Sequence, residues 1–193
     1  FTVTSLGYSN KIIYRNKAKL NDDIYVTGNL GDSYLGLKLL RNKTNVKKKD
    51  KIFFIDKYYK PKLPLNLTQY LLKIANSSID VSDGLIDDLY KMINRQNLSF
   101  HLFENKIPVS KNLNNLIKKQ KLNKINLVSK GDDYQVLFTA DLNKARIIQK
   151  ASKTTRIKIT KIGKIVSGKD KSLVFDEKGK QIQAKSRGYI HRF

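Results

Sequence analysis

Acidic and hydroxyl side chains gather in the stretch from Ser77 to Asp88. A short apolar run typical of a strand ends there, and an apolar pattern at helical spacing begins at Leu85. The stretch predicts a strand, a tight turn and a helix, with Asp80 and Asp83 converging at the end of the strand. The backbone N–H groups of Gly84 and Leu85 would face outward at the helix N-terminus. Such a turn suits a divalent cation and a phosphate bound together.

Two turns also have simpler interpretations. Asp83 can serve only to cap the helix that follows it, as Asp commonly does. The turn from Gly28 to Ser33 contains two glycines that could cradle a phosphate. A lone Gly-x-x-Gly-Asp motif is equally typical of a structural turn that ends in helix-capping residues. The spacing alone leaves these alternatives open.

The elements that must position these turns follow from hydrophobic periodicity. Strands are predicted at residues 24–27, 98–103, 157–166 and 172–175 and directly after the loop with Asp132 and Asp133. Helices are predicted at 35–40, 65–74, 110–120 and 145–150. Phe1 to Leu6 also alternates, and we expect it to be a strand that completes a preceding sheet. Residues 42–62 form a basic excursion typical of a solvated loop or helix face. This mixture of strands and helices indicates an α/β or α+β domain.

Composition limits the possible classes of protein. The 193 residues suffice for one sizeable domain, and the formal net charge is +23. The lysines are spread along the chain with one tight run, Lys47–Lys49, and no RNA- or DNA-binding signature accompanies them. Coding bias toward A and T explains this charge as well as a nucleic-acid surface does. The lack of cysteine excludes disulfides and thiolate metal sites.

The sequence shows neither a targeting segment nor a membrane-spanning segment. The sequence contains no signal peptide and no apolar run of 18 residues, so we expect a soluble, cytoplasmic protein without a membrane partner. The chain begins with Phe1 instead of an initiator Met, and we expect it to lie inside a longer protein.

Four separated segments together resemble thiamine-monophosphate kinase. They are Tyr25-Val26-Thr27-Gly28 with Leu30-Gly31-Asp32-Ser33, Ile79-Asp80-Val81-Ser82-Asp83-Gly84-Leu85, Gly131-Asp132-Asp133-Tyr134 with Leu137-Phe138-Thr139, and the terminal Gly188-Tyr189, His191 and Phe193. They occur in that family's order and roughly its spacing. The family belongs to the superfamily of aminoimidazole ribonucleotide synthetase and selenophosphate synthetase, two-domain enzymes that use ATP and dimerise through the N-terminal domain.

The resemblance implies an architecture. Residues 1–22 would be the end of a missing N-terminal domain plus a connector. Residues 23–193 would be a C-terminal α+β domain, a mixed β-sheet flanked by α-helices. A homodimer would form through the missing domain, and the domain alone would be poorly active.

The resemblance also implies a reaction, the magnesium-dependent transfer of a phosphoryl group from ATP to thiamine monophosphate, which gives thiamine diphosphate. Asp80 and Asp83 would be magnesium ligands, with Asp83 as the catalytic residue. Ser82 and Arg15 would bind ATP, Arg15 through the nucleotide phosphates. The substrate pocket would be lined by Asp132 or Asp133 and by Tyr189, whose ring would pack on the heterocycle.

The chain departs from the usual family pattern at two places. The family usually has Gly-Gly-Glu-Asp-Tyr-Glu at residues 130–135, where this chain has Lys-Gly-Asp-Asp-Tyr-Gln. The family's tail commonly reads Gly-Tyr-Asp-His-Phe, whereas here Ile190 replaces the Asp and Arg192 is inserted. Three alternatives therefore stay open. They are a non-catalytic relative, an enzyme of the same superfamily with another substrate, and a basic nucleic-acid-binding module.

Overall fold

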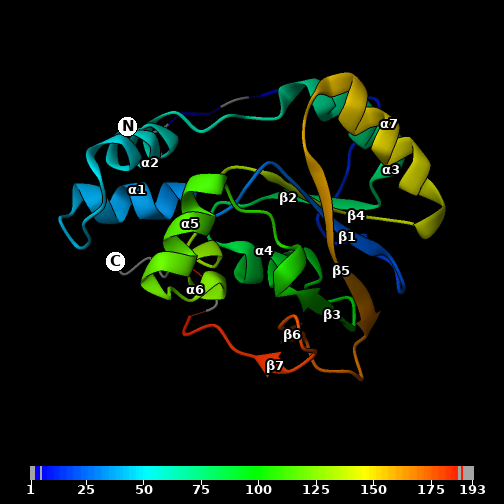
Figure 1. Cartoon of the computed structure of the whole chain (residues 1–193). Coiled ribbons are helices and arrows are strands. Elements are labelled where there is room, and N and C mark those ends of the chain that lie inside the picture. Colours follow the sequence, from blue (N-terminus) through cyan, green and yellow to red (C-terminus); the bar gives the residue numbers. More distant parts are fainter. Residues whose placement is uncertain (1–2, 5, 187, 189–193) are drawn as a thin grey trace.

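A seven-stranded mixed sheet forms the centre of the computed structural model, which describes residues 3–4, 6–186 and 188 (Figure 1). The strands are β1 (Asp23–Thr27), β2 (Ser77–Asp80), β3 (Leu98–Phe103), β4 (Val136–Ala140), β5 (Ile159–Ser167), β6 (Leu173–Phe175) and β7 (Gln181–Ile182). Their order in the sheet is β2-β4-β1-β5-β3-β6-β7. The β3–β6 pair is parallel and the other neighbours are antiparallel.

Seven α-helices surround this sheet. They are α1 (Asp32–Leu40), α2 (Lys48–Tyr59), α3 (Thr68–Ile74), α4 (Leu85–Met92), α5 (Lys111–Gln120), α6 (Lys124–Val128) and α7 (Ala145–Thr155), with short 3-10 helices η1 (Leu65–Leu67), η2 (Glu104–Lys106) and η3 (Leu142–Lys144). None of the helices in the described part of the chain is long and apolar enough to cross a bilayer. The observed fold confirms the predicted α+β class with a mixed sheet.

Different helices cover the two faces of the sheet. Because side chains alternate along each strand, successive residues of β1 pack against different helices. Ile24 and Val26 of β1 pack with α4 in the largest core cluster. Tyr25, between them, points to the other face, where its ring stacks on Phe138 of β4 at 5.3 Å. Helices α3 and α7 cover this face (Figure 1). A third cluster joins α1, α2, α5 and α6.

Most elements predicted from periodicity are present in the structure, with shifted ends. The basic excursion at 42–62 contains α2, which is the predicted helix face. Val3, Thr4 and Leu6 lie in no strand of this structure, so the strand from Phe1 to Leu6 that would complete the sheet of a missing domain stays a prediction. Val3 and Leu6 are about nine-tenths exposed, since no neighbouring strand pairs with them. The predicted domain boundary after Asp22 stays a prediction.

Helix α4 should account for a large share of the stability, because its apolar face packs against the sheet. Leu89 is fully buried there, whereas Ile52 on α2 is 63% exposed. Leu89→Ala should lower the free energy of unfolding by about 2–5 kcal/mol through lost contacts and a cavity. Ile52→Ala should change it by less than about 0.5 kcal/mol. Urea denaturation of both variants tests this, and equal losses would contradict the packing described.

Candidate functional site

Three segments meet at one edge of the sheet. The β1–α1 turn (28–31) and the β2–α4 turn (81–84) follow the two strands that flank β4, and the loop 130–135 precedes β4, which is antiparallel to both. The start of β4 therefore lies where β1 and β2 end. The amide N–H of Tyr134 donates to the Val81 carbonyl at 2.9 Å, and that of Asp132 donates to the Ser82 carbonyl at 2.9 Å. These two bonds bring the predicted acidic residues of separate motifs together.

The loop 130–135 approaches the β2–α4 turn at Gly131. A Cβ atom at this position would lie 2.0 Å from the Ser82 carbonyl oxygen, and the residue has a φ of +79°. Both the contact and the left-handed backbone therefore require glycine. Asp132 and Tyr134 also have positive φ, at 62° and 49°. This backbone positions successive side chains of the loop on different sides.

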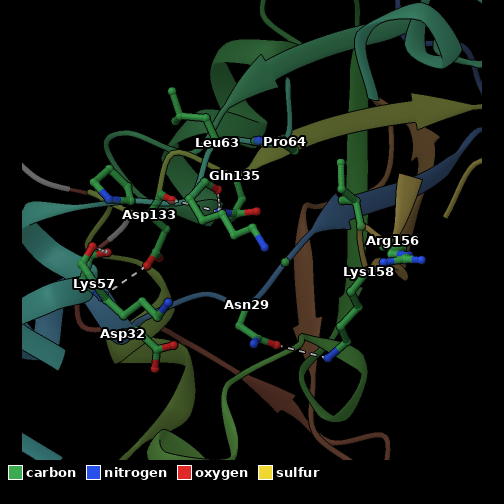
Figure 2. A pocket seen from close by; sticks show the side chains of 14 residues that line it. Asn29, Asp32, Lys57, Leu63, Pro64, Asp133, Gln135, Arg156 and Lys158 are labelled. Carbon is green, nitrogen blue, oxygen red and sulfur yellow. Dashed lines mark hydrogen bonds between the residues drawn. The ribbon is translucent and has the colours of Figure 1, made fainter. Parts of the chain in front are cut away.

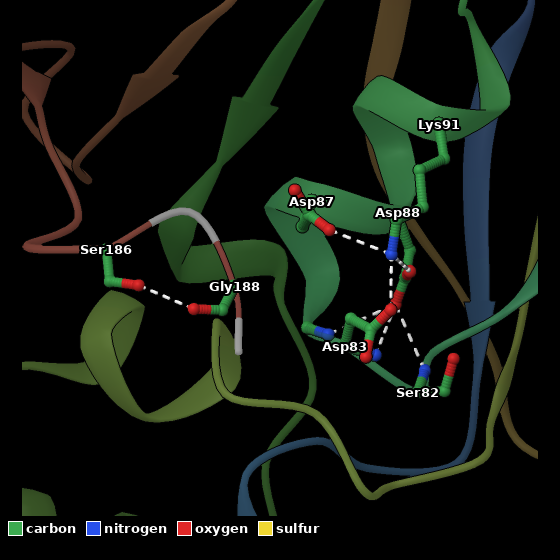
Figure 3. Close-up of polar contacts among 8 residues, drawn as sticks. Ser82, Asp83, Asp87, Asp88, Lys91, Ser186 and Gly188 are labelled. Carbon is green, nitrogen blue, oxygen red and sulfur yellow. Dashed lines mark hydrogen bonds and ion pairs between the residues drawn. The ribbon is translucent and has the colours of Figure 1, made fainter. Parts of the chain in front are cut away.

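The N-terminus of α4 is held by Asp88, a residue of the helix itself. Its Oδ2 atom accepts the backbone N–H groups of Ser82, Asp83 and Gly84 at 3.0, 3.0 and 3.1 Å (Figure 3). No side chain caps the helix at its N-cap position, Gly84. The interpretation of Asp83 as a helix cap is therefore wrong. The expectation that the Gly84 N–H faces outward, free for a ligand, is also wrong because Asp88 accepts it.

Lys91 lies over an acidic group on α4 and the turn before it (Figure 3). Its Nζ pairs with Asp83, with Asp87 at 2.8 Å and with Asp88 at 3.2 Å. Burial lowers the pKa of Lys91, but the hydrogen bonds that its ammonium donates to the three carboxylates outweigh this and raise the pKa above its ordinary value. Within the described part of the chain, Asp83, Asp87 and Asp88 can each place one carboxylate oxygen within 4.8 Å of the others. An all-oxygen set of this kind suits a hard divalent cation.

The remaining predicted carboxylates face the phenol of Tyr134. Burial raises the pKa of Tyr134, and the charges of Asp132, Asp80 and Asp83 raise it further. A cavity of about 370 Å³ opens at this point. Its lining residues are Leu37, Arg41, Tyr58, Ser82, Asp83, Asp132 and Tyr134. We call it the Tyr134 cavity.

Asp133 faces away from the Tyr134 cavity and holds the β1–α1 turn. It is 4% exposed, and its carboxylate accepts the N–H of Gly31 at 2.7 Å and that of Ser33 at 3.4 Å. The N-cap residue of α1 is Gly31, which has no side chain that could cap the helix. The expected capping by residues of the turn is therefore wrong. The Gly31 N–H is not free for a phosphate, which favours the structural interpretation of the Gly-x-x-Gly turn.

A second buried acid, Asp32, lies beside Asp133. Burial raises the pKa of Asp133 to about 7, against the lowering effect of the Gly31 N–H, and the charge of Asp32 raises it as well. Burial raises the pKa of Asp32 to about 6, although the Ser110 hydroxyl donates to it at 2.7 Å and Lys57 lies near. The interior at this edge therefore contains two carboxyl groups that bind protons more tightly than exposed ones.

Comparison with known proteins relates this chain to one enzyme family. No family model matches the chain. The thiamine-monophosphate kinase of Buchnera aphidicola subsp. Schizaphis graminum is 37% identical over 180 residues, which are 93% of this chain and 55% of that protein. Thiamine-monophosphate kinase from Stenotrophomonas maltophilia K279a superposes with a TM-score of 0.75 at 27% identity, covering 90% of this chain and 55% of that one. The chain is a homologue of the thiamine-monophosphate kinases.

A second structure of a thiamine-monophosphate kinase carries ligands. AaThiL complexed with AMPPCP and TMP superposes with a TM-score of 0.74 at 27% identity, covering 94% of this chain and 55% of that one. The chain thus spans about half the length of the relatives it matches.

The residues that the resemblance to thiamine-monophosphate kinases assigns do not all meet. Ser82, Asp83 and Asp132 line the Tyr134 cavity, and exposed Asp80 acts on the same phenol. Arg15 lies elsewhere, because its carbonyl accepts the Ser77 hydroxyl at the start of β2 and its side chain is exposed. Its role at the nucleotide phosphates stays a prediction.

The C-terminal tail reaches the same region through Gly188. A Cβ atom at Gly188 would lie 2.6 Å from the Cβ of Asp87 and 2.9 Å from the Asp83 carbonyl, so the tail passes directly over the start of α4. Tyr189, predicted to line the substrate pocket, lies outside the described residues. Sequence reasoning did not single out Tyr134 or Arg41. Tyr134 stands within the quoted motif, whereas no sequence signal distinguishes Arg41 from the other basic residues.

Asp88 should be the structural acid of this site and Asp87 a replaceable one. Asp88→Ala removes the acceptor of three N–H groups and should lower the free energy of unfolding by about 3 kcal/mol. Asp87→Ala removes only a partly exposed ion pair to Lys91 and should cost less than about 1 kcal/mol. Urea denaturation distinguishes them, and a loss at Asp87 as large as at Asp88 would contradict this assignment.

The buried acid Asp133 should make stability fall with rising pH. Its folded pKa of about 7 lies above the ordinary value of 3.8, so the folded state binds the proton more tightly between these values. The stabilisation is complete below about pH 4 and is lost as the pH rises through 7. Relative to Asp133→Asn, the parent should therefore be more stable at pH 5 than at pH 8. The measurement is the urea denaturation midpoint of both proteins at both pH values. A midpoint difference between parent and variant that is the same at pH 5 and pH 8 would refute the prediction.

Proposed function

We propose that this chain supplies part of the active site of an enzyme that transfers a phosphoryl group from ATP to the phosphate of thiamine monophosphate. The observation that carries the proposal is the Tyr134 cavity, because it gathers Ser82, Asp83 and Asp132 from two separated motifs. AMPPCP is a methylene analogue of ATP, and the ligands of the structurally similar AaThiL therefore support the two substrates. Because the chain spans about half of its relatives, we propose the activity for the complete gene product.

Phosphoryl transfer asks mainly for positioning and charge neutralisation. Asp83, with Asp87 and Asp88 beside it, and Asp80 at the end of β2 would hold Mg²⁺. Bound there, the metal would offset the negative charge of the phosphates. Lys91 now pairs with the first three of these acids, so it supplies the positive charge that this acidic group otherwise lacks.

The structure supports one choice between the two adjacent acids of the loop 130–135. Asp132 lines the Tyr134 cavity, whereas Asp133 directs its carboxylate to the N–H groups of Gly31 and Ser33. We therefore assign the substrate contact to Asp132, as an acceptor for the exocyclic amine of the substrate. Ser82 and Arg15 at ATP, Tyr189 on the heterocycle, a homodimer and a cytoplasmic location stay predictions.

The test is an assay of the complete gene product with thiamine monophosphate, ATP and Mg²⁺, in which thiamine diphosphate is measured. Asp83→Asn keeps the size of the side chain but removes its charge, and should lower kcat at least about 100-fold. Asp170→Asn, at an exposed position in the turn after β5, is the charge-matched control and should leave kcat unchanged.

Two results would overturn the proposal. An Asp83→Asn variant with the kcat of the parent would remove Asp83 from the reaction. A folded parent that binds ATP but forms no thiamine diphosphate would indicate a non-catalytic relative or another substrate.

A further inference from the structure

A second cavity, of about 220 Å³, lies beside the β1–α1 turn (Figure 2). The loop 130–135 borders both this cavity and the Tyr134 cavity, but alternate side chains of the loop line each of them. Asp133 and Gln135 line this cavity, whereas Asp132 and Tyr134 line the other. It is therefore a separate space. None of the described residues proposed to contact the metal, ATP or the substrate lines it, and Asp133, which does line it, is a structural acid.

Four cationic side chains converge on this second cavity from three parts of the chain. They are Lys57 of α2, Lys62 of the following loop, and Arg156 and Lys158 between α7 and β5. Among the described residues, none of the four forms a salt bridge with a carboxylate. Lys158 donates to the Asn29 amide oxygen at 3.1 Å, which holds its ammonium at the rim (Figure 2). The rim thus presents positive charge that no salt bridge in the described part of the chain neutralises, although Lys57 lies near the buried Asp32.

The floor and one wall have a different character. Asp32 and Asp133 form the floor and are 5% and 4% exposed. Leu63, Pro64 and Ile157 add an apolar wall. A ligand here meets cations at the rim, hydrogen-bonding carboxyl groups at the floor and apolar surface between them.

The position of this wall is set by Gln135. Its Nε2 donates to the Lys62 carbonyl at 3.1 Å, and its Oε1 accepts the Thr27 hydroxyl at 2.9 Å. The side chain is 8% exposed. A Glu at this position could not donate to the Lys62 carbonyl, so the amide ties the cationic loop to the end of β1. The cavity is thus built by specific bonds on both sides.

We propose that the second cavity binds a small phosphomonoester. The phosphate would lie among the lysine and arginine groups of the rim, since these are the side chains that bind phosphate oxygens. The organic part would rest on the apolar wall, with its hydroxyl groups donating to Asp32 and Asp133. The volume is below the roughly 300–1,000 Å³ of sites for drug-sized ligands, which favours a ligand of monosaccharide-phosphate size.

Ribose 5-phosphate serves as the probe, titrated into the ¹⁵N-labelled chain and followed by ¹H–¹⁵N NMR. Saturable shifts are expected at Gly28, Asn29 and Ile157, with inorganic phosphate and with ribose each binding at least 10-fold more weakly. The double variant Lys62→Gln/Lys158→Gln should weaken ribose 5-phosphate at least 10-fold. Its control, Lys118→Gln/Lys150→Gln, removes the same charge from exposed positions on α5 and α7 and should bind like the parent.

Four outcomes would overturn the proposal. They are shifts that do not saturate, equal weakening in the two double variants, shifts centred on Ser82 and Asp132, and inorganic phosphate that binds as tightly as the ester. The first two would show only attraction to a highly basic chain. The third would place the ligand in the Tyr134 cavity, and the fourth would remove the role of the organic part.

Discussion

Backbone N–H groups at the starts of α1 and α4 need acceptors, and neither helix supplies one from its N-cap side chain. Two buried carboxylates meet this requirement. Asp88 accepts the N–H groups of the turn before α4, and Asp133 reaches across about a hundred residues of sequence to the turn before α1. Because the two turns follow β1 and β2, the strands on either side of β4, these acids fix the edge of the sheet at which the functional side chains stand. The structural acids are therefore as necessary to the site as the acids exposed in it.

Much of the fold is readable from the sequence because its elements have clear periodicity. The strand, turn and helix around Gly84 and the Ser110 cap of α5 are local, and local patterns predict them. Helix α6 is less apparent, because it is only five residues long and lies among loop-forming residues. The segment from Phe1 to Leu6 shows the limit of periodicity, because its described residues form no strand within this chain. Alternation describes a surface that could pair with a strand, and pairing depends on a neighbour that the pattern does not contain.

The site was harder to predict than the fold, since the sequence reveals which acids exist but not where each one points. Asp80, Asp83, Asp87 and Asp88 lie within nine residues, and the resemblance to thiamine-monophosphate kinases favours the first two as ligands. The structure gives Asp88 the structural task and also places its carboxylate beside those of Asp83 and Asp87. Burial decides these roles. A carboxylate without solvent must find donors, and Asp88, at 1% exposure, has three from the backbone.

The loop 130–135 explains why one short motif serves two cavities. Its side chains alternate, so Asp132 and Tyr134 face one space while Asp133 and Gln135 face the other. The bond from Tyr134 to Val81 and the contact of Gly131 with Ser82 fix this alternation, because they set the register of the loop against the β2–α4 turn. Moving the loop by one residue would exchange the two sets of side chains, placing a structural acid in the Tyr134 cavity and withdrawing Asp132 from it. The main-chain register, more than any single side chain, therefore determines which acid meets a ligand.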